Sequence, residues 1–362
     1  MKNKKIWFFL SLLCLLSGGL FVLLGTLLGG IPGFYLDKNG IHTSRETASQ
    51  TMNVFQDTIE LDPFDSMELN IYNAEDVTLI PSDRYAVEYR ITGIYEKPVC
   101  QAEDGRLIFR ETSTVYNDPG IWFLYASPRS EYIREPGPYY VKIEYPADQI
   151  FTDVKIRMEC GDLKLPFIQA DTLDIQDDYG DVSLDGFTGT AWNLYMSSGN
   201  LAVGSVTAEQ TNILSEYGDV SLKDYTGNTL DIRMSSGDLS LGPVTAEQTE
   251  IQNEYGTVQI EQAFADSLTA NLSSGSFLAG SLDVPALKVV NEYGSVRILL
   301  PGTLSDYGYQ LQTEYGSVLL GGKSLANSGE EEDEIHYTSA GTNGKTIEIL
   351  CDSGDIIIDP VP

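Results

Sequence analysis

The segment Asn212-Ile-Leu-Ser-Glu-Tyr-Gly-Asp-Val-Ser-Leu222 has a counterpart 19 positions further along the chain, Asp231-Ile-Arg-Met-Ser-Ser-Gly-Asp-Leu-Ser-Leu241. Both stretches place apolar residues at alternate positions on each side of one glycine. This alternation predicts two short β-strands, each with one buried face, joined at a sharp bend that the glycine occupies. One such unit cannot bury its own apolar face, so the pattern predicts that successive units stack.

The spacing extends through the second half of the chain. Eight glycines follow one another at a constant interval of 19 positions, and two more continue the series after steps of 22 and 38 positions. We expect each to lie at a bend, where positive φ and close stacking exclude a Cβ atom. The predicted fold is all-β, a single-stranded β-solenoid (β-helix) with coils of about 19 residues. Its predicted corner glycines are Gly161, Gly180, Gly199, Gly218, Gly237, Gly256, Gly275, Gly294, Gly316 and Gly354.

The units alternate between two types. One type ends in Ser-Ser-Gly after a large apolar residue, as at Met196–Gly199 and Met234–Gly237, and the other ends in Glu-Tyr-Gly, as at Glu216–Gly218 and Glu254–Gly256. We expect the residues three and one positions before the glycine to point inwards, so that a tyrosine in one coil packs against a serine in the next. This pairing favours one unit per coil, and a coil of twice that length with two columns of corners is the alternative.

The first 30 residues indicate a membrane anchor. Residues 1–5 carry three lysines, and residues 6–30 are apolar and uncharged, long enough as a helix to cross a bilayer core of about 30 Å. Because this stretch exceeds the apolar region of a signal peptide, we predict an uncleaved single-pass helix with a cytoplasmic N-terminus and an extracellular body. The lipid bilayer is thus one predicted partner. Weak helix–helix self-association is suggested by a small-xxx-small stripe, for which ordinary glycine use in a span is the alternative: Gly25, Gly29 and Gly33.

The rest of the chain divides into three predicted parts. Residues 31–55 are polar and unpatterned and are predicted to be a linker, residues 56–150 a β cap region, and residues 151–362 the solenoid repeats. Within the cap region, Met67–Ile71 and Val77–Leu79 resemble a repeat unit in which Ala74 to Asp76 replace the glycine corner.

An insertion at residues 112–138 is rich in proline, glycine and aromatic residues. It is interpreted either as a recognition loop for a sugar or a protein, or as a hairpin that packs over the end of the solenoid. The candidate recognition residues are Tyr116, Trp122, Phe123, Tyr125 and Tyr132.

Composition argues against several functional classes. The formal net charge of −31 repels nucleic acid. Two histidines and four cysteines without a C-x-x-C pair leave almost no candidate zinc ligands, so we predict no metal site and no cofactor. The sequence leaves open whether Cys100 and Cys160 form a disulfide. The chain carries no G-x-S-x-G motif and no phosphate-binding loop, so we predict that it is not an enzyme, with carboxylate chemistry on a glycan as a remote alternative.

Several segments resemble a known family. They are Phe64-Asp-Ser-Met-Glu-Leu-Asn-Ile71, Asp76-Val-Thr-Leu-Ile-Pro81, Tyr140-Val-Lys-Ile-Glu-Tyr-Pro146 and Ser235-Ser-Gly-Asp-Leu-Ser-Leu241. Together they resemble the bacterial putative-adhesin family of membrane-anchored β-strand-repeat domains of unknown function, over roughly Thr58 to Asp359. The resemblance implies an envelope-exposed β-repeat domain, often behind one transmembrane helix.

These patterns together predict a membrane-anchored extracytoplasmic interaction or adhesion module on the cell surface. Its rigid β-solenoid surface is expected to contact an envelope protein or a glycan of unknown identity. One alternative is an envelope-stress sensor or regulator, which requires a membrane partner because the short cytoplasmic N-terminus cannot form an output domain. A carbohydrate-active enzyme on a β-helix is the remote alternative.

Overall fold

The computed structural model describes residues 17–21, 24–25, 27–28, 34–37, 40–43, 54–92, 96–111, 121–123, 137–325 and 334–361. The chain forms two compact units. One consists of Gln56–Ile91, Pro98–Glu111 and Pro138–Pro362, and the other of Met1–Phe55, Thr92–Lys97 and Thr112–Gly137.

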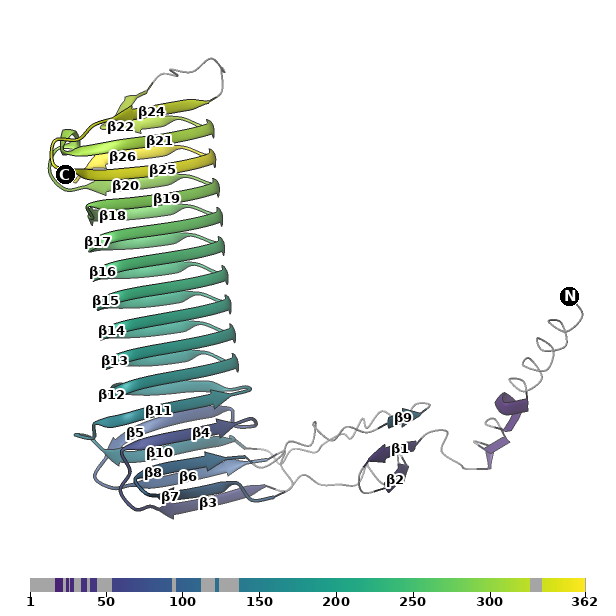
Figure 1. Ribbon diagram of the computed structural model, residues 1–362. Helices are drawn as coiled ribbons and strands as arrows, with labels where there is room; N and C mark the ends of the chain where they lie inside the picture. The colour runs from purple at the N-terminus through teal and green to yellow at the C-terminus, as the bar shows by residue number, and fades with distance from the viewer. Residues whose placement is uncertain are drawn as a thin grey trace, which may run out of the picture. The chain divides into compact units, whose positions relative to one another are not determined.

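The larger unit is a β-solenoid (Figure 1). Its middle coils each form one long strand that pairs in parallel with the next, and paired residues such as Leu201 and Val220 are 19 positions apart. This register confirms one repeat unit per coil and excludes the coil of twice that length. The middle strands are β12 (Asp162–Tyr179), β13 (Val182–Ser198), β14 (Leu201–Tyr217), β15 (Val220–Ser236), β16 (Leu239–Tyr255) and β17 (Val258–Ser274).

Apolar columns along the stack form the core. In the column two positions after the corner glycine, Leu201, Val220 and Leu239 are each 1% exposed. Because paired strands lie about 4.8 Å apart, each of these side chains packs on its equivalents in the coils on either side. Full burial of such a side chain stabilises the fold by about 1.5–3 kcal/mol, which explains why neighbouring coils depend on one another.

The structure places the predicted glycines at one corner column. Gly218 has φ +127°, and a Cβ atom on it would overlap the carbonyl oxygen of Gly199 in the preceding coil. The Gly218 N–H donates to the Ser236 carbonyl oxygen of the following coil at 3.1 Å. Positive φ and this close backbone stacking each exclude a side chain. Gly316 occupies the same column without positive φ.

The residue after each corner glycine links successive corners. The Asp219 N–H donates to Asn200 Oδ1 at 3.0 Å, and the Asp238 N–H donates to Asp219 Oδ1 at 2.9 Å. These bonds satisfy turn amides. The repeated Gly-Asp therefore has a structural cause.

The tyrosines one position before the glycine do not point inwards, contrary to the sequence-based prediction. Tyr217 and Tyr255 are both 60% exposed, whereas Ser215 and Asn253, three positions before the glycine, are 1% exposed. The small buried residue forms a hydrogen bond to the backbone, since Asn253 Nδ2 donates to the Gly237 carbonyl oxygen at 3.0 Å. It hydrogen-bonds the preceding corner instead of making room for a tyrosine ring.

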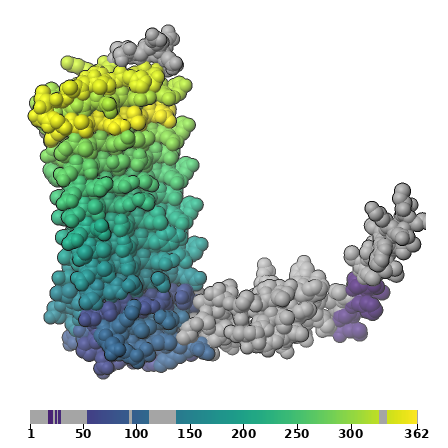
Figure 2. All heavy atoms as spheres, in the orientation of Figure 1, coloured from purple at the N-terminus to yellow at the C-terminus, as the bar shows by residue number. Residues whose placement is uncertain are grey.

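The C-terminal coils are not stacked in chain order. Gly354 packs on Gly294, and Gly316 packs on Gly354, so the last coil lies between two earlier ones, as the yellow strands inside the green layers show (Figure 1). Figure 2 shows the same coils as colour bands on the surface. The elements are β18 (Phe277–Asp283), β19 (Ala286–Tyr293), β20 (Val296–Leu300), the 3-10 helix η2 (Leu304–Asp306), β21 (Tyr307–Tyr315), β22 (Val318–Leu320), β23 (Lys323–Ser324), β24 (Ile335–Ser339), β25 (Lys345–Ser353) and β26 (Ile356–Pro360).

Alternation of the two unit types explains this insertion. In chain order, two Glu-Tyr-Gly units follow each other at Glu292–Gly294 and Glu314–Gly316. The inserted coil places Cys351 between the buried polar residues Asn291 and Thr313, and Ser353 between two tyrosines. The large–small alternation of the core is thereby continued to the end of the stack.

Antiparallel strands terminate the parallel stack at both ends. β24 pairs antiparallel with β21, β6 pairs antiparallel with β10, and β7 with β8. Such strands cover edges that otherwise present unpaired backbone groups. The strands at the N-terminal end are β3 (Phe55–Glu60), β4 (Ser66–Ile71), β5 (Asp76–Ser82), β6 (Ala86–Ile91), β7 (Val99–Glu103), β8 (Arg106–Arg110), β10 (Tyr140–Pro146) and β11 (Phe151–Met158).

Strands β4 and β5 form a coil whose corner is Ala74. Met67 pairs with Val154, Val77 pairs with Leu163, and the Ala74 carbonyl oxygen lies against Gly161. The segment thus stacks as a repeat unit, as its pattern predicted. Within the described part of the chain, Cys100 and Cys160 are not joined by a disulfide.

In the smaller unit, β1 (Phe34–Asp37) pairs with β2 (Gly40–Thr43) and with β9 (Ile121–Phe123). Two strands thus occupy the segment predicted to be a linker. Within the described residues, no helix has the length and apolarity needed to cross a membrane. Most of residues 6–30 lie outside the described residues, as do Gly29 and Gly33. No atom of the described part of the chain lies within 4 Å of a Cβ atom placed on Gly25.

Candidate functional site

Outward-facing side chains form columns on the faces of the solenoid. Because each residue pairs with the one 19 positions further on, equivalent side chains of neighbouring coils lie about 4.8 Å apart. A ligand that lies along the solenoid axis would therefore meet one side chain from each coil.

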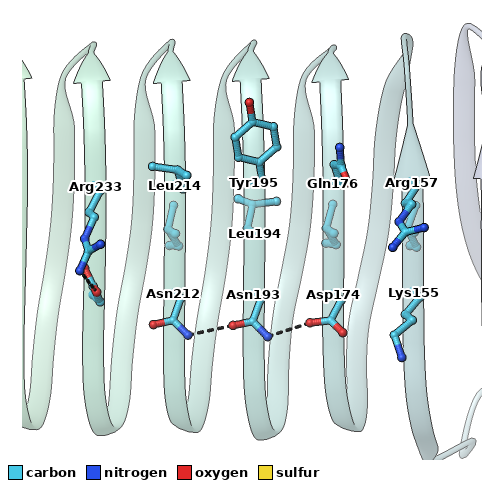
Figure 3. A pocket seen from close by; sticks show the side chains of 14 residues that line it. Lys155, Arg157, Asp174, Gln176, Asn193, Leu194, Tyr195, Asn212, Leu214 and Arg233 are labelled. Carbon is cyan, nitrogen blue, oxygen red and sulfur yellow. Dashed lines mark hydrogen bonds and ion pairs between the residues drawn. The ribbon is translucent and has the colours of Figure 1, made fainter.

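A shallow groove of about 540 Å³ crosses β11 to β15 on one face. Its polar and apolar side chains project from the same face in two parallel columns (Figure 3). We call it the face groove. The outward-facing residues that line it are Lys155, Arg157, Asp174, Gln176, Asn193, Tyr195, Asn212, Leu214, Asp231 and Arg233.

The first column is a ladder of amides and carboxylates. Asn212 Nδ2 donates to Asn193 Oδ1 at 2.8 Å, and Asn193 Nδ2 donates to Asp174 Oδ1 at 2.7 Å. Each amide has a second N–H and a second lone pair on its oxygen. The ladder fixes the side chains while leaving donors and acceptors for a ligand, and Asn193 and Asn212 are exposed.

The second column has an apolar centre. Tyr195 and Leu214 occupy adjacent coils, and Leu214 is 43% exposed. The Tyr195 hydroxyl donates to Glu216 Oε1 at 2.8 Å and also lies 3.0 Å from Ser197 Oγ. These contacts hold the ring in place, so it offers a pre-organised aromatic surface.

Cationic side chains stand at both ends of the face groove. Lys155 Nζ lies 2.8 Å from Asp153 Oδ2, and Arg233 lies 2.8 Å from Asp231 Oδ2. Burial would raise the pKa of Asp153, but hydrogen bonds from Lys155 and Thr172 outweigh burial and lower this pKa. Arg157 is exposed and has no ion-pair partner among the described residues. Arg157 and Arg233 are four coils apart, about 19 Å.

The predicted recognition residues that the structure describes, Trp122 and Phe123, belong to the smaller unit. Trp122 and Phe123 lie in β9, where they pair with Tyr35 and Phe34, and Tyr116, Tyr125 and Tyr132 lie outside the described residues. The sequence-based predictions did not include the groove residues, because the repeat is most regular at the corners and the groove residues lie at outward positions between them. Alignment of the outward positions at the repeat interval would have placed Tyr195 and Leu214 in one column.

Potential metal ligands do not cluster among the described residues. These residues contain no group of three His, Cys, Asp or Glu residues arranged to hold a metal ion. His336 Nε2 lies 2.6 Å from Glu334 Oε1, and His42 lies in β2.

Comparison with known proteins identifies the family to which the repeats belong. The family model described as Toastrack DUF4097 matches residues 64–242 and 193–359. This confirms the resemblance inferred from sequence. Comparison with curated proteins gives no match.

Three solved structures share low identity with the chain. A putative adhesin from Parabacteroides merdae ATCC 43184 has 12% identity and a TM-score of 0.45, covering 68% of this chain and 96% of its own. A putative adhesin from Parabacteroides distasonis ATCC 8503 has 13% identity and a TM-score of 0.42, covering 68% and 97%. A putative lipid binding protein from the same strain has 13% identity and a TM-score of 0.38, with the same coverage.

Proposed function

The chain belongs to the Toastrack family of β-repeat domains, and from this premise we propose that it is an extracytoplasmic interaction module that binds an extended acidic glycan in the face groove. One observation carries the proposal. An aromatic and aliphatic centre, Tyr195 and Leu214, lies beside an ordered amide ladder, and cationic side chains stand at both ends.

The chemistry of the groove fits a sugar chain. Asn193, Asn212 and Gln176 each present donors and acceptors of the kind that neighbouring sugar hydroxyls use. The Tyr195 ring offers an apolar face to sugar C–H groups, and few, well-placed polar groups around an apolar surface are typical of ligand sites.

Charge selects the acidic class of glycan. The protein has a net charge of −31, and in the face groove Lys155, Arg157 and Arg233 offset the carboxylates of Asp174 and Asp231, so the repulsive field is weaker there. A guanidinium group binds a carboxylate through two parallel hydrogen bonds. Ligand carboxylates about 19 Å apart would reach Arg157 and Arg233 at the same time.

We also propose that residues 6–30 anchor the protein in the membrane with the solenoid outside the cell. The support is the uncharged apolar stretch after three lysines. Extraction of membranes at alkaline pH tests this proposal, because a spanning helix keeps the full chain in the pellet. Complete release into the supernatant would contradict it.

The glycan proposal is tested with the full chain on an array of acidic and neutral oligosaccharides, followed by calorimetry on the best ligand. We expect Tyr195→Ala to weaken binding about tenfold, as expected for loss of a central contact. Tyr195→Phe keeps the ring and should bind nearly as the wild type. Arg157→Gln should weaken the binding of acidic oligosaccharides and leave the binding of neutral ones unchanged.

The matched control is Asn271→Ala, which lies four coils along the same column from Tyr195 and outside the groove. It should leave affinity unchanged. Absence of binding to every acidic glycan would overturn the proposal, as would equal losses in Asn271→Ala and Tyr195→Ala.

A further inference from the structure

A second surface runs along the corner column. From the Gly180 coil onwards, the position before the corner glycine alternates strictly between tyrosine and serine through nine stacked coils. The inserted last coil preserves this order by placing Ser353 between Tyr293 and Tyr315. We call the row the tyrosine edge, and its rings are Tyr179, Tyr217, Tyr255, Tyr293 and Tyr315.

The rings of the tyrosine edge project into solvent. All five are 60–65% exposed, and among the described residues no stacking partner or hydrogen bond is found for these rings. The coils that carry serine at this position have the same corner geometry, for example Gly199 with φ +125° and Gly218 with φ +127°. Folding therefore does not require tyrosine here, and an ordered row of exposed aromatic rings marks an interaction surface.

Each tyrosine has a carboxylate beside it in the chain. The residue before it is Asp178, Glu216, Glu254, Glu292 or Glu314, whereas three of the four serine coils have another serine in that place. Glu254, Glu292 and Glu314 are exposed. Aromatic rings and carboxylates thus repeat together every second coil, and this combination favours a ligand with regularly spaced cations.

The spacing of the rings selects the conformation of a peptide ligand. Two coils span about 9.6 Å. A polyproline II helix repeats its side-chain direction every three residues, or about 9.3 Å. A β-strand repeats every two residues, or about 6.6 Å, and an α-helix after seven residues, or about 10.5 Å. The polyproline II repeat agrees most closely.

We propose that the tyrosine edge binds a basic, proline-rich segment of a partner protein in the polyproline II conformation. Prolines dock between and against the tyrosine rings, as polyproline II ligands dock on aromatic-lined surfaces. A lysine or arginine in each triplet pairs with the carboxylate beside the ring. The tyrosine edge is a different row of residues from the lining of the face groove, and the two surfaces meet at Glu216, which accepts a hydrogen bond from Tyr195. Neither proposal rests on the other.

The test measures fluorescence anisotropy of labelled peptides with the full chain. Peptides of two to seven Lys-Pro-Pro triplets should bind with affinity that rises with length. The affinity should stop rising at a peptide length of about 13 residues, since four intervals of the tyrosine edge span about 38 Å and polyproline II advances about 3.1 Å per residue. Lys-Gly-Gly peptides of equal length and charge should bind at least tenfold more weakly.

The decisive variant combines Tyr217→Ser, Tyr255→Ser and Tyr293→Ser. It copies the residue that the alternate coils carry, so the fold should be kept, and circular dichroism verifies this. Binding of the longest Lys-Pro-Pro peptide should fall at least tenfold. The matched control combines Phe167→Ser and Phe264→Ser, which remove rings that are 54% and 47% exposed elsewhere on the coils, and should leave binding unchanged.

Two outcomes would overturn the proposal. One is equal binding of Lys-Pro-Pro and Lys-Gly-Gly peptides, because that shows attraction by charge alone. The other is unchanged binding in the triple tyrosine variant. A cationic amino-sugar polymer that binds to the tyrosine edge while the peptides do not would assign the surface to a glycan and also refute a peptide partner.

Discussion

The buried carboxyl group of Asp177 provides the sharpest test of the corner geometry. Asp177 is 0% exposed, and neither carboxylate oxygen has a hydrogen bond of ordinary geometry to any residue in the described ranges. Burial raises the pKa of Asp177 to about 7 from an ordinary value of 3.8, the nearby Tyr179 N–H opposes this, and Asp178, Asp162 and Asp181 add to it. Ionised Asp177 therefore destabilises the folded protein.

The magnitude follows from this pKa. The difference between 3.8 and about 7 corresponds to a penalty on the order of 4 kcal/mol when Asp177 is ionised. At the equivalent positions Asn253 and Asn291 donate Nδ2 to the preceding corner carbonyl at 3.0 Å. Asp177→Asn should remove the charge and add a bond to the Gly161 carbonyl oxygen, for a gain of about 2–4 kcal/mol above pH 8.

The pH dependence separates this cause from others. Because the pKa of Asp177 is raised in the folded state, its contribution to the free energy of unfolding is fully present below pH 3.8 and is lost as the pH rises towards 7. The gain in Asp177→Asn should therefore be small near pH 4 and full above pH 8. Urea unfolding followed by the fluorescence of Trp192, fully buried in the neighbouring coil, measures it.

The control is Asp178→Asn, which changes the same charge on a half-buried neighbour. It should change the free energy of unfolding by less than about 0.5–1 kcal/mol. Equal gains for Asp177→Asn at pH 4 and pH 8, or no gain at pH 8, would refute the assignment of an unpartnered buried carboxylate.

Further predictions concern the corner, the inserted coil and its thiol. Gly218→Ala should destabilise the fold by more than about 3 kcal/mol because of a clash with the Gly199 carbonyl oxygen, whereas Gly322→Ala, with φ +73° and no atom within 4 Å of the added Cβ, should cost about 1 kcal/mol; similar losses in thermal unfolding would contradict this. Truncation after Leu325 removes the inserted coil and should expose residues 307–320 to limited proteolysis, and full protection there would count against the insertion. Cys351 is 2% exposed, and burial raises its thiol pKa to about 11, so maleimide labelling of Cys351 at pH 8, read from the mass of its peptide, should require unfolding. Rapid labelling of Cys351 in the native protein is the opposing result.

The solenoid was predictable because its period is strict. The glycine spacing, the alternation around Gly218 and the pseudo-repeat at Met67–Leu79 were sufficient for the stacking of coils and for the Ala74 corner, since one backbone geometry repeats with few exceptions. The choice between coils of 19 and 38 residues was left open by the sequence and is decided by the strand register. The direction of the tyrosines was wrong because the alternation of a strand ends at a bend. Periodicity alone does not show where the bend reverses inside and outside.

The order of the last coils had a sequence signal that was overlooked. Two Glu-Tyr-Gly units in succession break the alternation, and the unit ending in Gly354 supplies the missing type. The face groove could not be predicted in the same way, because it depends on which outward positions are occupied by Tyr195, Leu214 and Arg157 rather than on the repeat. Such positions are not constrained by the core.

Distances between spin labels on one outward column test the coil order most directly. Ser221 pairs through Ser240, Gln259, Leu278 and Arg297 to Ile357 and then to Leu319. The structure predicts that a label at position 357 lies five coils from one at position 221, about 24 Å, and that a label at position 319 lies six coils away, about 29 Å. A shorter distance to position 319 than to position 357 would show coils stacked in chain order and contradict the account.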